Sequence, residues 1–119
     1  MRGASASRRA ESAGPEPATD PRARLIVVSG PAAGRELALD RPRMLLGRDS
    51  EADFVLADVS LSKLHALFLR TDQGYQLQDL ESANGTWVNG VRTEIALLEP
   101  GDRIALGEHV LQYVLDPLG

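Results

Sequence analysis

The amino-acid sequence predicts an all-β protein, built as a two-sheet sandwich of about eleven strands. Three observations favour this fold class. From residue 25 onward, short runs of Leu, Ile, Val and aromatic residues alternate with Gly, Pro, Asn and Asp. These runs recur at a spacing of roughly 8 to 12 residues, which is typical of strands joined by turns. No stretch combines the periodicity and the length of an amphipathic helix.

Individual segments support the prediction in chain order. The fifth expected strand is apolar on both faces, as a central strand of a two-layer fold would be. The sixth alternates cleanly, so Tyr75 and Leu77 are expected to face inward. Asn89-Gly90 is the strongest hairpin signal, because a type I′ turn needs two residues that tolerate positive φ. The expected strands are residues 25–29, 35–40, 44–47, 54–56, 64–69, 75–78, 86–88, 91–92, 95–98, 103–106 and 109–115.

The amino-terminal segment has a different composition. The first 22 residues contain three prolines and no aromatic residue, Val, Ile or Leu, so they bury too little apolar area to offset the entropy of ordering. We expect a disordered tail over residues 1–23, one domain over 24–116 and a short C-terminal end over 117–119. Thr19 lies in an acidic, Pro-rich stretch and is a candidate regulatory phosphosite through which the tail would dock onto the domain. A solvated extension is the simpler interpretation.

Composition argues against several classes of function. The chain has no cysteine and two histidines, so neither a thiolate metal site nor a His-based metal cluster is expected. Residues 24–119 carry nine basic and fourteen acidic residues, a balance unsuited to the nucleic-acid backbone. No apolar run approaches the roughly 18 residues of a membrane span, and no apolar stretch follows the first arginines as in a secretory signal. We expect a cytoplasmic protein that uses no metal or cofactor and binds neither nucleic acid nor membranes.

Three short segments carry side chains that suit an anion. Arg48 ends one expected strand, and Ser62-Lys63 precedes another. A phosphate monoester brings about −1.5 to −2 charges and three acceptor oxygens. A guanidinium, a hydroxyl and an ammonium from loops at one end of a sandwich are its natural donors. Asn84-Gly85 follows an irregular stretch, which would leave the Asn84 amide free to bond the backbone of another chain with one donor and one acceptor.

His65 allows a second interpretation of the same region. With Ser62 it would form a nucleophile and its base, but no acidic orienting residue and no strand-to-helix elbow is evident. We therefore disfavour a hydrolase. The preferred interpretation is that the ring nitrogens of His65 hydrogen-bond the preceding loop and hold Ser62 in place.

These motifs together identify a resemblance. The order and separation of Leu46-Gly47-Arg48, Ser62-x-x-His65-Ala66 and Asn84-Gly85-Thr86-x-Val88-Asn89-Gly90 resemble the forkhead-associated (FHA) domain, a phosphothreonine-recognition module. The resemblance spans residues 24–116. It implies an FHA-like sandwich of eleven strands that binds an extended peptide on its loops at one end, without catalysis.

The resemblance also implies roles for individual residues. Arg48 and Ser62 match the phosphate ligands of the family, and Lys63 stands where a basic or amide side chain often assists. Asn84 matches the asparagine that holds the peptide backbone. The residues that match site-shaping positions are Gly47, His65, Gly85 and Thr86. Two departures weaken the match: Lys63-Leu64 replaces a frequent Arg-Arg pair, and Ala83 stands where several members place a hydroxyl residue.

The sequence thus predicts a non-catalytic module that binds phosphothreonine-containing segments of partner proteins downstream of a Ser/Thr kinase. We expect it to be monomeric. The alternative is a scaffold that uses the same sandwich for contacts independent of phosphate. The joint presence of Arg48, Ser62 and Asn84 argues against that alternative, because such a scaffold has no physical need of all three.

Overall fold

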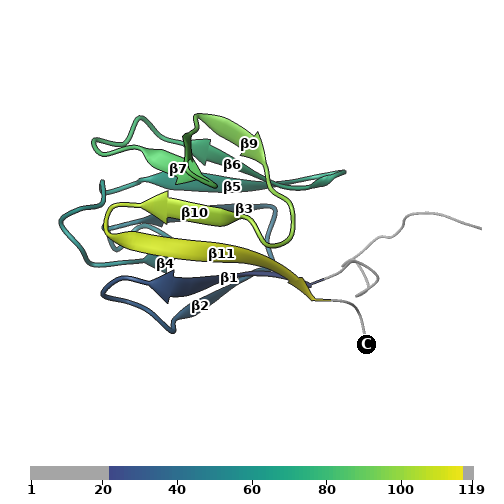
Figure 1. The fold of residues 1–119 in the computed structure, drawn as a ribbon, viewed down its shortest axis with the longest axis horizontal. Coiled ribbons are helices and arrows are strands. Elements are labelled where there is room, and N and C mark those ends of the chain that lie inside the picture. The colour runs from purple at the N-terminus through teal and green to yellow at the C-terminus, as the bar shows by residue number, and fades with distance from the viewer. Residues whose placement is uncertain (1–21, 117–119) are drawn as a thin grey trace, which may run out of the picture.

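The computed structural model describes residues 22–116, which form eleven strands in two sheets (Figure 1). The all-β sandwich predicted from the sequence is confirmed. Within the described residues there is no helix that is long and apolar enough to span a membrane. The strands are β1 (Arg22–Ser29), β2 (Glu36–Leu39), β3 (Arg43–Gly47), β4 (Phe54–Val55), β5 (Ala66–Thr71), β6 (Gly74–Asp79), β7 (Thr86–Val88), β8 (Val91–Arg92), β9 (Ile95–Leu97), β10 (Arg103–Leu106) and β11 (His109–Asp116).

The two sheets have different strand orders. One sheet has six strands in the order β2-β1-β11-β10-β7-β8, and the other has five in the order β4-β3-β5-β6-β9. Only β3 and β4 pair in parallel among the strand pairs of residues 22–116. As the apolar faces of segment 64–69 predicted, β5 is the central strand of its sheet. The chain crosses between the sheets several times, which brings loops far apart in sequence to the same ends.

The core lies between the inner faces of the two sheets. Alternate residues of each strand point inward, and Tyr75 and Leu77 of β6 do so as predicted, with 4% and 0% of their surface exposed. Burying one such large apolar side chain contributes about 1.5–3 kcal/mol, so this layer holds the sheets together. The largest fully buried apolar side chains in this layer are Leu25, Met44, Leu46, Leu56, Phe68, Leu77, Ile104, Leu106, Leu111 and Tyr113.

Two strands begin two or more residues away from the predicted start, and the other strand starts agree within one residue. β1 begins at Arg22 rather than Leu25, because it pairs with β11 as far as Asp116. β5 begins at Ala66 rather than Leu64, because the backbone before it forms hydrogen bonds with loop 48–53 instead of continuing the strand pairing. The amide of Arg48 donates to the Ser62 carbonyl, and that of Asp49 donates to the Lys63 carbonyl, both over 3.0 Å.

The sandwich has two ends with different loops, which we name the site end and the far end. The site end, on the left in Figure 1, comprises loops 48–53, 56–65 and 80–85 together with turns 30–35 and 107–108. The far end comprises turns 72–73, 89–90 and 99–102. A groove of about 570 Å³ lies at the far end, between the β5–β6 turn and the last strand, and is lined in part by Arg70, Tyr75, Pro100 and Tyr113.

Candidate functional site

Gly47 lets two loops of the site end meet backbone to backbone. A Cβ at this position would clash with the Lys63 carbonyl oxygen and would lie 2.8 Å from the Lys63 carbonyl carbon. A side chain would therefore separate the two backbones that are joined by the amides of Arg48 and Asp49. The glycine is required for close approach, since its own φ lies outside the left-handed region.

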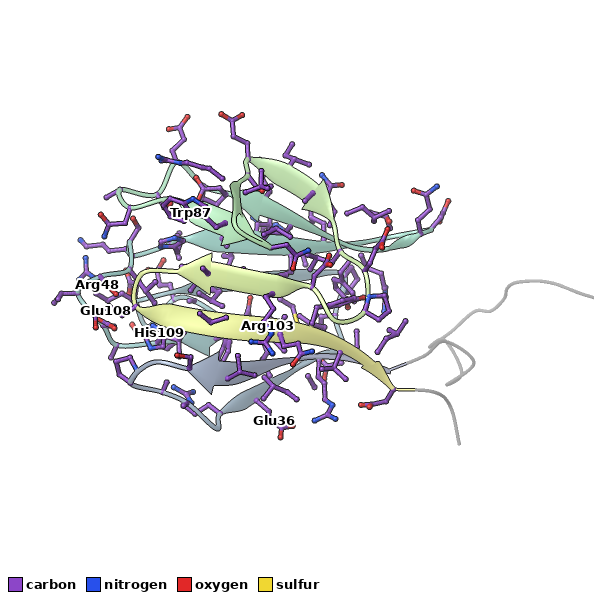
Figure 2. All side chains as sticks on the ribbon, in the orientation of Figure 1. Glu36, Arg48, Trp87, Arg103, Glu108 and His109 are labelled. Carbon is purple, nitrogen blue, oxygen red and sulfur yellow. The ribbon has the colours of Figure 1, made fainter. Side chains whose placement is uncertain are left out.

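Arg48 follows Gly47 and extends from the site end (Figure 2). Its backbone amide is fixed on Ser62, and its side-chain Nε donates to the Leu61 carbonyl over 3.1 Å. This bond orients the guanidinium while the residue as a whole stays exposed. The two terminal amino groups are thus presented to solvent in the fork geometry that suits two oxygens of a phosphate.

Ser62 is anchored through three of its own groups. Its amide donates to His65 Nδ1 over 3.1 Å, its carbonyl accepts from Arg48, and its Oγ accepts from the Ala83 amide over 2.9 Å. A hydroxyl that accepts in this way still has its proton to donate. Lys63 is exposed, and its backbone carbonyl accepts from Asp49. Its ammonium adds positive charge next to the Ser62 hydroxyl.

His65 is fully buried and joins two loops of the site end. Nδ1 accepts from the Ser62 amide, which makes Nε2 the protonated nitrogen, and Nε2 donates to the Gly85 carbonyl over 2.9 Å. The sequence predicts loop support of this kind for His65, and its part in ligand binding stays a prediction. The bond to Ser62 involves the amide rather than Oγ, so the two residues do not form the nucleophile–base pair of a hydrolase.

Asn84 is tied to a neighbouring loop through its side chain. Nδ2 donates one proton to the Ser60 carbonyl over 2.9 Å, which leaves one donor and one acceptor of the amide for a peptide backbone, and that role stays a prediction. The bond forms because loop 80–85 folds against loop 56–65, where the Ser60 carbonyl points at Asn84. Asn84 stays exposed, and the bond to Ser60 fixes the orientation of its amide group.

Asp79 organises loop 80–85, a role that was not predicted from the sequence. Its carboxylate accepts from Ser82 Oγ over 2.6 Å, from Thr86 Oγ1 over 2.7 Å and from the Ser82 amide over 3.2 Å. Burial by itself would raise the pKa of Asp79, but these hydrogen bonds from Ser82 and Thr86 outweigh it and lower the pKa below its ordinary value. An Asp that ends a strand three residues before a Ser was the available signal.

Gly85 and Thr86 are buried below the exposed residues of the site end. Gly85 has φ of +87°, and a Cβ there would lie 2.9 Å from Arg92 Nε and 3.0 Å from the Trp87 ring. The guanidinium of Arg92 stacks over that ring, 5.4 Å from its centre. Thr86 is fully buried, which places it beneath the site and makes its role one of loop support.

The predicted site residues come together around three consecutive positions. The Ser60 carbonyl holds Asn84, the Leu61 carbonyl holds Arg48, and Ser62 presents its own hydroxyl. A guanidinium, a hydroxyl and a carboxamide are therefore fixed relative to one short stretch of backbone, with Lys63 directly after it. This arrangement suits an anionic group attached to an extended chain. Thr19, the predicted phosphosite, lies outside the described residues.

Comparisons with known proteins match this domain. A family model described as "Inner membrane component of T3SS, cytoplasmic domain" (Yop-YscD) matches residues 26–115. The oxoglutarate dehydrogenase inhibitor of Corynebacterium diphtheriae is 39% identical over 93 residues, which are 78% of this chain and 65% of that protein. The glycogen accumulation regulator GarA of Mycolicibacterium smegmatis is 37% identical over 78% of this chain and 59% of its own length. The chain thus spans less than two-thirds of these relatives.

Solved structures agree in both fold and sequence. A structure from an analysis of phosphothreonine-dependent FHA domain interactions has a TM-score of 0.75 and 31% identity, over 82% of this chain and 99% of that one. The FHA domain of CT664 from Chlamydia trachomatis has a TM-score of 0.73 and 32% identity, over 78% of this chain and 96% of that domain.

Proposed function

This chain belongs to the FHA family, to which the FHA-like Yop-YscD match also points, and from this premise we propose that it binds phosphothreonine-containing segments of partner proteins. The proposed phosphate ligands are Arg48, Ser62 and Lys63, and the proposed peptide-backbone ligand is Asn84. The partner is a protein phosphorylated by a Ser/Thr kinase, and both act with this chain in the cytoplasm. The work of the site is recognition without catalysis.

One observation carries the proposal. The anchors of Arg48 and Asn84 are the neighbouring carbonyls of Leu61 and Ser60, and Ser62 follows directly. The hydrogen-bond donors of the site are therefore oriented before the ligand binds, which lowers the entropic cost of binding. The names of similar proteins support the same function, since one solved structure concerns phosphothreonine-dependent interactions and another is the EmbR protein of Mycobacterium tuberculosis in complex with a phosphopeptide.

The test compares a phosphothreonine peptide with its unphosphorylated form. The peptide is recovered from a degenerate phosphothreonine library on the wild-type chain, and its affinity is measured by fluorescence anisotropy. Truncating one partner of a buried charge pair costs roughly 2–5 kcal/mol, so Arg48→Ala is expected to weaken binding about 30-fold to several-thousand-fold. The unphosphorylated peptide is expected not to bind.

Arg103→Ala is the matched control. Arg103 is also exposed, but it begins β10 at the far end, away from Arg48 (Figure 2). Its removal changes the net charge equally and should leave the affinity unchanged. Equal binding of the phosphorylated and unphosphorylated peptides would contradict the proposal and favour a scaffold that is independent of phosphate.

Thr19 is the predicted regulatory phosphosite. The sequence suggests that phosphorylated Thr19 docks onto the domain in cis, but the fold does not favour this. Only Asp20 and Pro21 separate Thr19 from β1, and Arg22 pairs with Asp116 at the far end, eight residues of β1 away from the site end. At about 3.3–3.6 Å per residue this linker is too short to bring Thr19 to the site. A chain phosphorylated at Thr19 is therefore expected to bind the external peptide as tightly as the unphosphorylated chain, and a loss of affinity would contradict this expectation.

A further inference from the structure

Asp58 holds the turn on which the proposed ligands depend. Its Oδ1 accepts from the Ser60 amide over 3.0 Å, and its carbonyl accepts from the Leu61 amide over 3.0 Å. These bonds close a tight turn over residues 58–61 and so set the directions of the Ser60 and Leu61 carbonyls. These two carbonyls orient the side chains that are proposed to bind the peptide.

The second carboxylate oxygen of Asp58 faces His109. Oδ2 lies 3.6 Å from His109 Nδ1, with 16% and 1% of the two side chains exposed. Both atoms are buried, and within residues 22–116 neither has a hydrogen-bond partner at a normal distance. A buried acceptor and a buried ring nitrogen are costly to leave apart, so a small shift that joins them is strongly favoured.

Two contacts hold His109 beside the turn. A Cβ at Gly30 would lie 3.0 Å from His109 Cα and 3.1 Å from its ring, so the β1–β2 turn packs directly on it. The residue before His109 is also tied to the turn, because the Glu108 amide donates to Ser60 Oγ over 3.1 Å. The ring is therefore confined beside the 58–61 turn, at the same end of the molecule as Arg48 (Figure 2).

We propose that Asp58 and His109 are a positioning pair for the phosphopeptide site. His109 Nδ1–H donates to Asp58 Oδ2, and this bond fixes the 58–61 turn that orients Arg48 and Asn84. Neither residue touches the peptide. The inference rests on the proposed function, because its effect is read in phosphopeptide affinity.

The test compares two substitutions of His109 in the full chain. His109→Leu keeps the apolar volume and removes the donor, while His109→Asn places an amide nitrogen near the position of Nδ1. Residues that act on a site without contacting the ligand change the free energy of coupling by about 0.5–2 kcal/mol, so His109→Leu is expected to weaken binding of the library-selected phosphothreonine peptide roughly two- to thirtyfold. His109→Asn should restore most of the affinity.

Asp102→Ala is the matched control, because Asp102 holds a turn at the far end. Its carboxylate accepts from the Glu99 amide over 2.8 Å and from Asn89 Nδ2 over 3.0 Å. This variant should lose stability and keep the wild-type affinity.

The outcomes separate this inference from the proposed function. Full affinity in a folded His109→Leu chain would overturn the positioning role, and so would equal weakening by Leu and Asn, since that result would report volume alone. If His109→Leu does not fold, Asp58→Asn takes its place: its oxygen can still accept from the Ser60 amide, while the acceptor that faces His109 is replaced by an NH2 group, so full affinity in this variant would overturn the positioning role. A wild-type chain that fails to prefer the phosphorylated peptide would instead contradict the proposed function.

Discussion

The two Asn-Gly dipeptides of this chain lie five positions apart and do different work. Asn89-Gly90 forms the β7–β8 turn at the far end, with φ of 51° and 85°. Both polar groups of the Asn89 side chain bond within the domain, Nδ2 to Asp102 and Oδ1 to the Arg103 amide. In Asn84-Gly85 only the glycine has positive φ, and the exposed asparagine is tied through Nδ2 to Ser60.

The difference comes from what surrounds each dipeptide. No atom lies within 4 Å of a Cβ built at Gly90, whereas one built at Gly85 meets Arg92 and Trp87. The far-end turn faces solvent, and the polar groups of its asparagine side chain are bonded within the domain. At the site end three loops pack against one another and leave donors pointing outward. Changes at the site end should therefore act on binding, and changes at the far end on stability alone.

The largest effect is expected for Gly47→Ala, which would break the site end. The added Cβ clashes with the Lys63 carbonyl and separates loops that carry Arg48 and Ser62. We expect a loss of about 1–3 kcal/mol in the free energy of unfolding and no measurable phosphopeptide binding. Urea denaturation and fluorescence anisotropy measure the two effects.

Gly90→Ala is the far-end counterpart. Space is available there, so the cost is the strain of positive φ, about 1–2 kcal/mol. Binding should remain at the wild-type level. Gly47→Ala with normal affinity would show that the close contact with Lys63 does not shape the site.

The substitutions Asn84→Ala and Asn89→Ala compare the two ends of the sandwich most directly. Losing the Asn84 amide removes one proposed peptide contact and should weaken binding roughly 5- to 150-fold with little change in stability. Losing the Asn89 amide removes its bonds to Asp102 and Arg103 and should cost about 1–3 kcal/mol of stability at unchanged affinity. Calorimetric titration and thermal unfolding of both variants test the contrast, which reversed effects would refute.

Asp79→Asn probes the network that shapes loop 80–85. Charge-assisted bonds from Ser82 and Thr86 are lost or weakened, so the variant should be about 1.5–3 kcal/mol less stable at neutral pH. The folded-state pKa of Asp79 is lowered, so its contribution is complete above the unfolded-state pKa of about 3.9 and disappears as pH falls below that value toward the folded-state pKa. Urea titrations should show the stability gap between wild type and variant closing below about pH 4. A gap that is constant over the whole pH range would mean that the carboxylate charge is not the source.

Lys63→Ala should give the smallest effect. Its backbone keeps the bond to Asp49, and only an exposed ammonium is removed, which is worth about 0.2–1 kcal/mol or up to fivefold in affinity. The difference from wild type should shrink as salt concentration rises. Arg70→Ala, an exposed cation on β5 next to the far-end groove, is the control and should not change binding. A loss as large as that of Arg48→Ala would make Lys63 a principal ligand.

Local patterns predicted the strands and the Asn89-Gly90 hairpin. Alternation of apolar and polar residues reports burial directly, since it repeats with the period of the strand. The dipeptide reports its own turn, because the positive φ values are a property of the two residues themselves. The ordered motifs also identified the family to which the chain belongs.

Contacts between loops were beyond the reach of local patterns. Asn84 and its partner Ser60 are 24 residues apart, and Asp58 and His109 lie still farther apart along the chain. Asp79 was missed because a strand-ending aspartate has no visible partner until loop 80–85 folds over it.

The sequence alone determined the strands, the core faces and the residue types available at the site end. Only the tertiary structure decided that the Asn84 amide donates to the Ser60 carbonyl, that Thr86 is buried beneath the site, and that Asp58 lies next to His109. The physical reason is that strand pattern depends on each residue and its near neighbours, whereas the orientation of a donor depends on which distant backbone the two sheets bring beside it.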